Sequence, residues 1–228
     1  MVEFFNMCWE IWFNMNEDIS IINKKTRNER IKNFFINNKK SLITFLAITI
    51  LIVFGYFGYE EVQNNKKIQL AEKYNSVLNK FILNKQANLK EDLVEIIYEK
   101  DTTYSPLALY FIIDNDIKTT NEEINKYFDI LINDLNLDKE IKNLIIYKKA
   151  LFNSDFETEN NLMAILKPLI NSESVWKSHA LYLMAEYFFD KNQNQKAKEF
   201  FNQILNNKNS NENIIKEAKK RLSRDLSE

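Results

Sequence analysis

Glycine is almost absent from this chain. Of its 228 residues only two are glycine, Gly55 and Gly58, and both lie inside one apolar run. Phosphate-binding loops of the P-loop and Rossmann types need glycine, because their backbone must approach the phosphates closely. The remainder of the chain cannot build such a turn, which excludes these classes of nucleotide-binding enzyme.

Histidine and cysteine each occur once, as His179 and Cys8. His179 follows Trp176 closely on a predicted helix, where a packed histidine is a more common outcome than a catalytic or metal-binding one. We therefore expect neither a Ser-His-Asp triad nor a histidine-rich metal site. Cys8 cannot form an internal disulfide, and no apolar signal stretch precedes it as in a lipoprotein anchor.

Neighbouring acidic residues are present but lie at predicted helix starts. Glu91-Asp92 and Glu122-Glu123 are placed to complement the helix dipole, and we favour that interpretation over general acid–base catalysis. We predict no enzyme activity, no catalytic residue, no metal, no cofactor and no small-molecule substrate.

Net charge of either sign is also small. The chain has 31 basic and 32 acidic residues, a formal net charge of −1. Seven basic and five acidic residues precede position 41, giving +2, and the rest of the chain carries −3. Neither part has the strongly basic character of a nucleic-acid-binding domain, so we expect no nucleic-acid partner.

The strongest positive feature is an uncharged run of eighteen residues, from Leu42 to Tyr59: LITFLAITILIVFGYFGY. An α-helix of roughly 20 apolar residues crosses the hydrocarbon of a bilayer and pairs all its backbone groups internally. A buried core helix is the disfavoured alternative, because core helices this apolar are usually shorter. The run predicts a transmembrane helix over residues 41–59, and Gly55 and Gly58 are candidates for close helix packing within it.

Basic residues near the run predict its orientation. Seven lie on the N-terminal side and four on the C-terminal side: Lys24, Lys25, Arg27, Arg30, Lys32, Lys39 and Lys40 against Lys66, Lys67, Lys73 and Lys80. This bias places the N-terminus in the cytoplasm. Residues 60–228 then lie across the membrane, in the periplasm if the cell is bacterial, and the chain is a single-pass protein of the inner membrane.

Residues 1–40 form the predicted cytoplasmic tail. Its first part, MVEFFNMCWEIWFNM, is rich in aromatic residues and is either an interfacial anchor or untranslated sequence ahead of a start at Met15, which leaves residues 1–14 outside the protein. Met7 is a further possible start. Residues 17–40 then read as a basic, weakly amphipathic helix that lies at an anionic membrane surface or simply fixes the topology.

The remainder of the chain is predicted to be all-helical. After the membrane run an apolar stripe continues to about Asn84, so one helix is expected to extend from the bilayer into the soluble part. Helix starts are expected at capping pairs: Asn88 with Glu91, Ser105 before Pro106, Thr120 with Glu123, Asp138, and Ser154 with Glu157. Three further helices are expected over 175–191, 194–206 and 212–225.

These helices recur in pairs. First helices of successive pairs start near 106, 139 and 175, and second helices near 121, 157 and 194, a period of about 34–37 residues. That period is typical of tetratricopeptide repeats, whose helix hairpins stack and share one core. The best-formed repeat is His179–Asn211, with Ala185, Phe188, Ala197 and Phe201 at pattern positions. We predict an α-solenoid of about three to four hairpins with a C-terminal capping helix.

Stacked hairpins present a concave face built from first helices, suited to extended peptides or partner helices. Five aromatic residues of these helices or their starts are candidate protein-binding anchors, although such residues often belong to the core of this fold: Tyr104, Tyr110, Tyr147, Trp176 and Tyr182.

Three stretches together resemble the YfgM-like family, ancillary subunits of the bacterial Sec translocon with a tetratricopeptide-like periplasmic domain. They are RNERIKNFFINNKKSLITFLAITILIVFGYFGYEEV at the membrane, then LKPLI, and WKSHALYLMAEYFFDKNQNQKAKEFFNQILNN near the end. The resemblance covers most of the chain from about Asp18, but the repeat glycines are missing. It implies binding of translocon subunits, periplasmic chaperones or exported polypeptides. The alternative function is a structural scaffold for a cell-envelope assembly or division complex.

Overall fold

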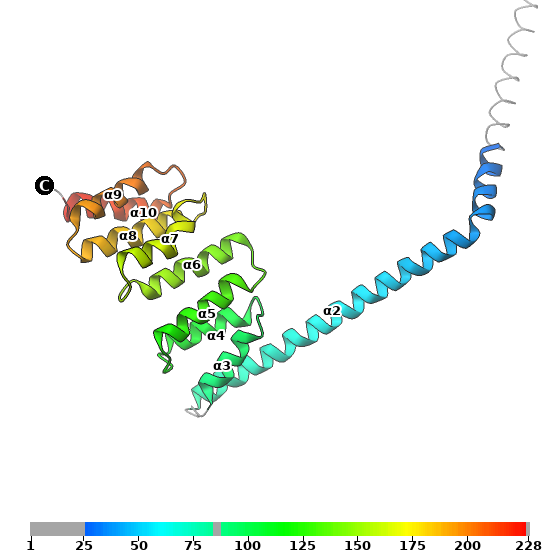
Figure 1. Ribbon diagram of the computed structural model, residues 1–228, viewed down its shortest axis with the longest axis horizontal. Helices are drawn as coiled ribbons and strands as arrows, with labels where there is room; N and C mark the ends of the chain where they lie inside the picture. The colour runs from blue at the N-terminus through cyan, green and yellow to red at the C-terminus, as the bar shows by residue number, and fades with distance from the viewer. Residues whose placement is uncertain (1–25, 84–87, 227–228) are drawn as a thin grey trace, which may run out of the picture. The chain divides into compact units, whose positions relative to one another are not determined.

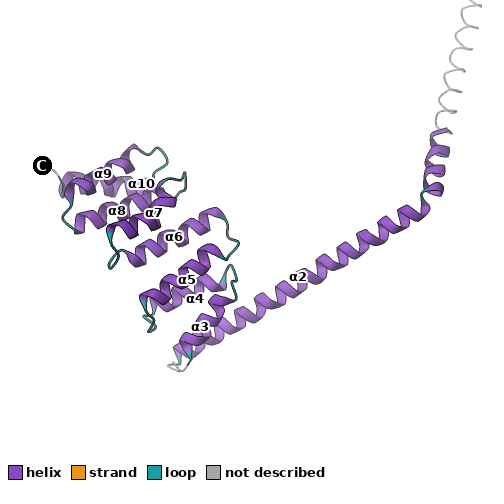
Figure 2. Ribbon diagram, in the orientation of Figure 1, coloured by secondary structure: helices purple, strands orange, loops and turns teal. Residues whose placement is uncertain are grey.

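The computed structural model describes residues 26–83 and 88–226. The aromatic N-terminal stretch, Cys8 and the choice of start residue lie outside these ranges. The chain divides into two compact units, residues 1–65 and residues 66–228. Within the described ranges every regular element is a helix (Figure 2), which confirms the predicted all-helical class.

The first unit contains two helical stretches separated by one turn residue. Residues 26–37 are helical, Asn38 forms the turn, and α2 begins at Lys39 and ends at Ile82. The Asn38 side-chain amide donates a 2.9 Å hydrogen bond to the carbonyl oxygen of Phe34, and the Asn38 backbone N–H donates to the same oxygen at 3.0 Å. Side chains that bond the carbonyl four residues back in this way often bend a helix.

Polar side chains inside the apolar run of α2 bond within the helix itself. The hydroxyl of Thr44 donates to the carbonyl oxygen of Lys40 at 3.0 Å, and that of Thr49 donates to Phe45 at 2.9 Å. A hydrocarbon environment requires such internal pairing, because nothing else there accepts a hydrogen bond. This helix is the one described segment long and apolar enough to be a candidate membrane span.

The end of α2 at Ile82 agrees with the predicted continuation to about Asn84. Its residues from Lys66 onward belong to the second unit, where Val77 is buried with 1% of its surface exposed. Tyr74 and Phe81 contact Phe111 edge-to-face, with ring centroids 6.4 and 5.2 Å apart. This part of the helix therefore supplies core residues to the repeat unit.

In the described part of the second unit, eight further helices follow one another as a stack (Figure 1). They are α3 (Leu89–Tyr98), α4 (Tyr104–Asp114), α5 (Asn121–Asn133), α6 (Lys139–Asn153), α7 (Glu159–Ile170), α8 (Lys177–Asp190), α9 (Asn194–Asn206) and α10 (Glu212–Arg224). The first helices α4, α6 and α8 start 35 and then 38 residues apart, and the second helices α5, α7 and α9 start 38 and then 35 apart. The predicted periodicity is confirmed.

The core of this unit consists of two clusters of buried apolar side chains that meet at α6. Ile145 of α6 belongs to the cluster built from the end of α2 and from α3, α4 and α5. Ala150 of the same helix belongs to the cluster built from α7 to α10. Each helix thus buries a stripe against its neighbours, as expected when no single hairpin can bury its apolar face alone.

The predicted best-formed repeat corresponds to α8 and α9. Ala185, Phe188, Ala197 and Phe201 are all buried, with at most 1% of their surface exposed. Phe188 stacks on Phe200 at 5.4 Å between ring centroids. Small residues at positions 185 and 197 let the two helices approach while the phenylalanines fill the space between them.

One predicted capping box is present in full. The Thr120 hydroxyl accepts a bond from the backbone N–H of Glu123, and the Glu123 carboxylate accepts one from the backbone N–H of Thr120 at 3.0 Å. Lys90 lies 3.0 Å from the same carboxylate. The Thr120 backbone bond, followed by Lys90, holds the pKa of Glu123 below its usual value.

Asn88 occupies the N-cap position of α3, as predicted, but its backbone is left-handed (φ 59°) and its side chain makes no capping bond. The predicted cap at Ser105 is wrong. Ser105 lies inside α4, buried, and donates to the carbonyl oxygen of Ile96 in the preceding helix. Asp101 instead accepts from the backbone N–H groups of residues 103 and 104, both at 2.8 Å.

The predicted helix start at Ser154 with Glu157 is also wrong. Ser154 ends α6, where its hydroxyl donates to the carbonyl oxygen of Leu151 at 2.8 Å. Thr158 is the residue that caps α7, accepting from the backbone N–H of Asn161. Asp138 does occupy the N-cap position of α6 but makes no side-chain capping bond.

Candidate functional site

Three exposed aliphatic side chains lie at or just before the starts of the first helices α4, α6 and α8. Leu107, Ile141 and Val175 have 41%, 46% and 63% of their surface exposed. Ile141 follows Leu107 by 34 residues and Val175 follows Ile141 by the same interval. We call these three residues the aliphatic ladder.

The ladder follows the first helices of the repeats. Leu107 and Ile141 lie in the first turns of α4 and α6, and Val175 immediately precedes α8. All three side chains therefore lie at the N-terminal ends of first helices, and we call the surface at these ends the first-helix face. Scattered exposed aliphatics are ordinary, whereas apolar residues that gather on one surface mark an interaction site.

Tyr110 and Lys148 extend this face. Tyr110 is one turn from Leu107 on α4, and Lys148 is two turns from Ile141 on α6. The Lys148 ammonium lies over the Tyr110 ring, 4.2 Å from its centroid. Burial, followed by the charge of Asp114, raises the pKa of Tyr110 to about 12. Its hydroxyl oxygen is buried and, among the described residues, has no hydrogen-bond partner.

A second group of rings joins α6 to the start of α8. Tyr147 stacks on Trp176 with 5.7 Å between ring centroids and 24° between planes. His179 contacts both rings, at 5.8 Å from Tyr147 and 5.1 Å from Trp176. The indole N–H of Trp176 donates to the carbonyl oxygen of Glu140 at 3.1 Å. Burial raises the pKa of Tyr147.

Tyr104 and Tyr182 lie in separate contacts. Tyr104 meets Tyr74 with 6.0 Å between ring centroids, and Tyr182 meets Phe201 edge-to-face at 5.6 Å. Burial, followed by a hydrogen bond to Glu186, raises the pKa of Tyr182. The structure therefore brings two of the five sequence-predicted aromatics together, Tyr147 and Trp176. All five are half-buried, and their role in binding stays a prediction.

The face carries basic side chains that the described part of the chain leaves without an ion pair. Lys142, Lys148 and Lys177 are half-buried, and in the described ranges no carboxylate lies within ion-pair distance of their ammonium groups. By contrast, Lys149 pairs with Asp129 at 2.7 Å on the other side of α6. A surface of exposed aliphatics with unpaired lysines is complementary to a segment that is apolar and acidic.

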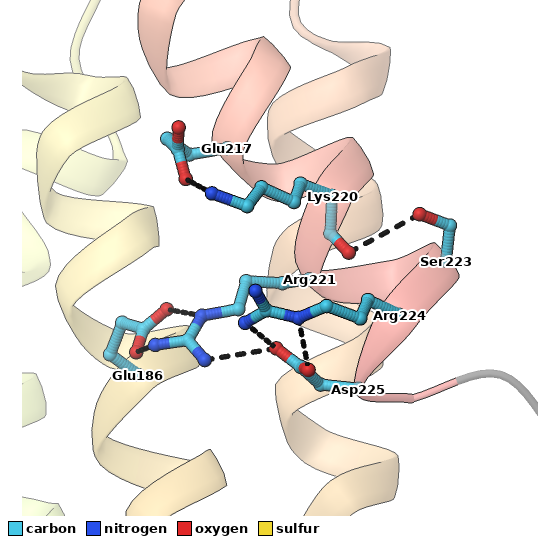
Figure 3. A network of polar contacts seen from close by, with 7 residues as sticks. All are labelled: Glu186, Glu217, Lys220, Arg221, Ser223, Arg224 and Asp225. Carbon is cyan, nitrogen blue, oxygen red and sulfur yellow. Dashed lines mark hydrogen bonds and ion pairs between the residues drawn. The ribbon is translucent and has the colours of Figure 1, made fainter.

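A polar network joins the last helix, α10, to α8 (Figure 3). The Arg221 guanidinium of α10 donates to both carboxylate oxygens of Glu186 on α8, at 2.8 and 2.6 Å, and lies 3.0 Å from Asp225. Arg224 contacts the same Asp225 carboxylate at 2.6 Å. Arg224, followed by Arg221, holds the pKa of Asp225 far below its usual value.

The two glycines lie on the exposed surface of α2. A Cβ added at Gly55 or Gly58 would meet no atom within 4 Å. Nothing inside the described chain therefore requires glycine at these positions. Their proposed use in packing against another helix stays a prediction.

Metal chemistry finds no support in the described residues. No group of three or more histidine, cysteine, aspartate or glutamate side chains in those ranges is arranged to hold a metal ion.

Sequence comparison identifies the class of the domain. Residues 32–122 match the family model described as a tetratricopeptide repeat-like domain. This stretch holds α2, α3, α4 and the start of α5, and it lies N-terminal to the best-formed repeat at α8 and α9. No curated protein and no solved structure matches the chain.

The match supports a tetratricopeptide-repeat family and agrees with the paired helices of the structure. Domains of this type are protein-interaction modules and are generally non-catalytic. The match therefore favours proteins as partners of the chain.

The aliphatic ladder was missed by sequence reasoning. Local periodicity identifies side chains that are buried, and a single exposed leucine carries no local signature. The signal that could have found the ladder is the recurrence of Leu, Ile and Val at intervals of 34 residues in the sequence.

Proposed function

We propose that this protein is a non-enzymatic, membrane-anchored binding module that acts beside the Sec translocon in the handling of exported proteins. α2 anchors it in the inner membrane as a single span, with the N-terminus in the cytoplasm and the repeats in the periplasm. Its partners are translocon subunits, a periplasmic chaperone or exported polypeptides. The resemblance to the YfgM-like family and the basic residues ahead of the apolar run support this assignment.

The observation that carries the binding role is the aliphatic ladder on the first-helix face. Leu107, Ile141 and Val175 are exposed near the starts of three first helices, and half-buried lysines that lack ion pairs in the described ranges lie close to them in the sequence. A soluble domain gains nothing in stability from such residues. They are explained if the face is covered by a partner that supplies apolar side chains and carboxylates.

An anchored repeat domain has a physical advantage over a free one. Confinement at the membrane surface raises its effective concentration near polypeptides that emerge there, without any additional contact. A face of modest affinity then suffices for capture.

Site-specific photocrosslinking tests this function. A photoreactive phenylalanine replaces Ile141 in one variant and Phe156, which is equally exposed at 45%, in a control variant. We expect position 141 to crosslink to translocon subunits, chaperones or nascent exported chains, and position 156 to yield at least about tenfold less. Equal yields at both positions would contradict binding through the first-helix face.

The identity of the crosslinked proteins separates the two candidate functions. Recovery of division or envelope-assembly proteins alone would favour the structural scaffold over the export role.

The glycines of α2 provide an independent test of the anchor as a contact surface. Replacing Gly55 and Gly58 with leucine blocks close approach of a second helix while leaving the apolar span intact. We expect reduced recovery of membrane-embedded partners. Unchanged recovery would show that the span is an anchor alone.

A further inference from the structure

A crevice of about 590 Å³ lies at the bend between residues 26–37 and the start of α2. This volume is within the usual range for ligand pockets, roughly 300–1,000 Å³. Its lining is apolar except for one lysine: Phe35, Ile36, Lys39, Leu42, Ile43, Phe45 and Leu46. The crevice lies at the turn at Asn38: Phe35 and Ile36 line it from before the turn, and the other lining residues belong to the start of α2.

The surroundings of the crevice are basic. From residue 26 to residue 40 the chain has five basic side chains and one acidic one, Glu29. The basic residues are Arg27, Arg30, Lys32, Lys39 and Lys40. The opposite end of the apolar run is closed by Glu60 and Glu61. Positive charge is therefore concentrated at the end of the span that carries the crevice.

Apolar side chains beside these charges face outward. Ile31, Phe34, Phe35 and Ile36 have 49% to 60% of their surface exposed. Basic residues next to exposed apolar ones are typical of helices that lie in the headgroup layer of an anionic membrane.

We propose that this crevice binds an anionic phospholipid, with an acyl chain along its apolar wall and the phosphate held by Lys39 and Lys40. An acyl chain has no hydrogen-bonding groups, so it can pack against the apolar wall without losing any hydrogen bond. A peptide would leave backbone N–H and C=O groups unpaired against that wall, at a considerable cost in free energy. The crevice is also continuous with the apolar span through Leu42.

This inference rests on the membrane anchoring in the proposed function, and the two can fail separately. Resistance of the protein to extraction from membranes at alkaline pH tests anchoring alone. The lipid site is tested on the full-length protein in mixed micelles that contain equimolar phosphatidylglycerol and phosphatidylcholine. Native mass spectrometry then counts the lipid adducts of each headgroup.

A matched pair of double variants isolates the proposed headgroup contact. We expect Lys39→Gln with Lys40→Gln to lower the ratio of phosphatidylglycerol to phosphatidylcholine adducts about tenfold or more. The control is Lys66→Gln with Lys67→Gln, an adjacent lysine pair of the same helix beyond the apolar run, which should leave the ratio unchanged. Equal effects of the two double variants, or no preference in the parent protein, would overturn the proposal.

The acyl-chain contact has its own test. Phe35→Ser with Ile43→Ser should reduce retained adducts of both lipids, with helical content by circular dichroism unchanged. Glycerol phosphate in excess, a headgroup without chains, should displace neither lipid. Displacement by glycerol phosphate would show a simple anion site and overturn the assignment to a lipid.

Discussion

Apolar side chains have opposite environments in the two units of the chain. Phe45 and Leu51 of the first unit have 70% and 71% of their surface exposed, whereas Phe201 and Leu166 of the second unit have none. In the first unit apolar residues surround one helix on all sides, and within residues 26–65 no neighbouring element covers them. In the second unit each helix has an apolar stripe that a neighbour covers.

The difference shows that residue type alone does not determine burial. The pattern around the helix decides whether protein or another apolar medium must cover the side chains. The aliphatic ladder is one exception inside the second unit, since its residues have exposed fractions of 41% to 63%. We interpret the exposed residues of the first unit as lipid-facing and those of the ladder as partner-facing.

The largest expected effect comes from truncating a core phenylalanine. Phe201→Ala should lower the free energy of unfolding of the repeats by about 3–5 kcal/mol, because it leaves a cavity between α8 and α9. Phe45→Ala, which removes the same group from the exposed helix, should change it by less than about 0.5 kcal/mol. Urea unfolding of the detergent-solubilised chain, followed by circular dichroism, measures both. Similar losses would contradict the contrast between the units.

The next effect concerns a reciprocal amide pair that joins α5 to α6. Asn125 and Asn153 each donate to the other's side-chain oxygen, at 2.8 and 2.7 Å, and Asn153 is fully buried. Asn153→Ala should cost about 1–3 kcal/mol of unfolding free energy, since it leaves a cavity and removes the partner of Asn125. In a double-mutant cycle, Asn125→Ala should cost much less unfolding free energy in the Asn153→Ala background than in the parent protein. Additive losses would show that the pair is not coupled.

A smaller effect is expected at the capping box of α5. Thr120→Ala should lower the unfolding free energy by about 1 kcal/mol, because it removes the acceptor for a backbone N–H of the first turn. Ser154→Ala, at a position that the sequence also marks as a cap, should cost clearly less, since Ser154 ends a helix. Thermal unfolding of the two variants compares their stabilities directly. An equal decrease in melting temperature would support the helix cap that the sequence predicts at Ser154.

The smallest expected effect is pH-dependent and involves the network around Asp225. The pKa of Asp225 in the folded chain is lowered by Arg224 and Arg221, so its ionised form stabilises the fold. This contribution is complete above the pKa that the aspartate carboxyl has in the unfolded chain, about 3.9. It is lost as the pH falls toward and through the lower pKa that Asp225 has in the folded chain. Solvent weakens it, since Arg224 is 60% exposed.

Asp225→Asn should therefore be less stable than the parent at neutral pH, and the difference in melting temperature should narrow below about pH 4. Melting curves of both proteins between pH 3 and 7 provide the measurement. A difference that stays constant across this range would exclude the carboxylate charge as its cause.

Sequence reasoning found the helices and their pairing because both depend on apolar periodicity. The stripe through Tyr74 and Phe81, for example, is visible in the sequence and is packed in the structure. Several caps were misplaced because serine and asparagine are common here, and tertiary contacts choose among them. The bond from Ser105 to Ile96 joins two helices, and no local pattern predicts it.

The candidate site was predicted only in part, for a similar reason. Tyr147 and Trp176 are recognisable as first-helix aromatics, but their stacking depends on how α8 packs on α6. The contact of Lys148 with Tyr110 likewise requires α6 beside α4.

The central claim is that one helix separates a cytoplasmic tail from a periplasmic repeat domain, and cysteine labelling tests it most directly. In a Cys8→Ser background, Asn28→Cys and Lys208→Cys place single exposed thiols on either side of the apolar run. A membrane-impermeant maleimide is applied to intact spheroplasts. We predict that position 208 is labelled at once and position 28 only after permeabilisation. Labelling of both positions from the outside, or of position 28 alone, would contradict the account.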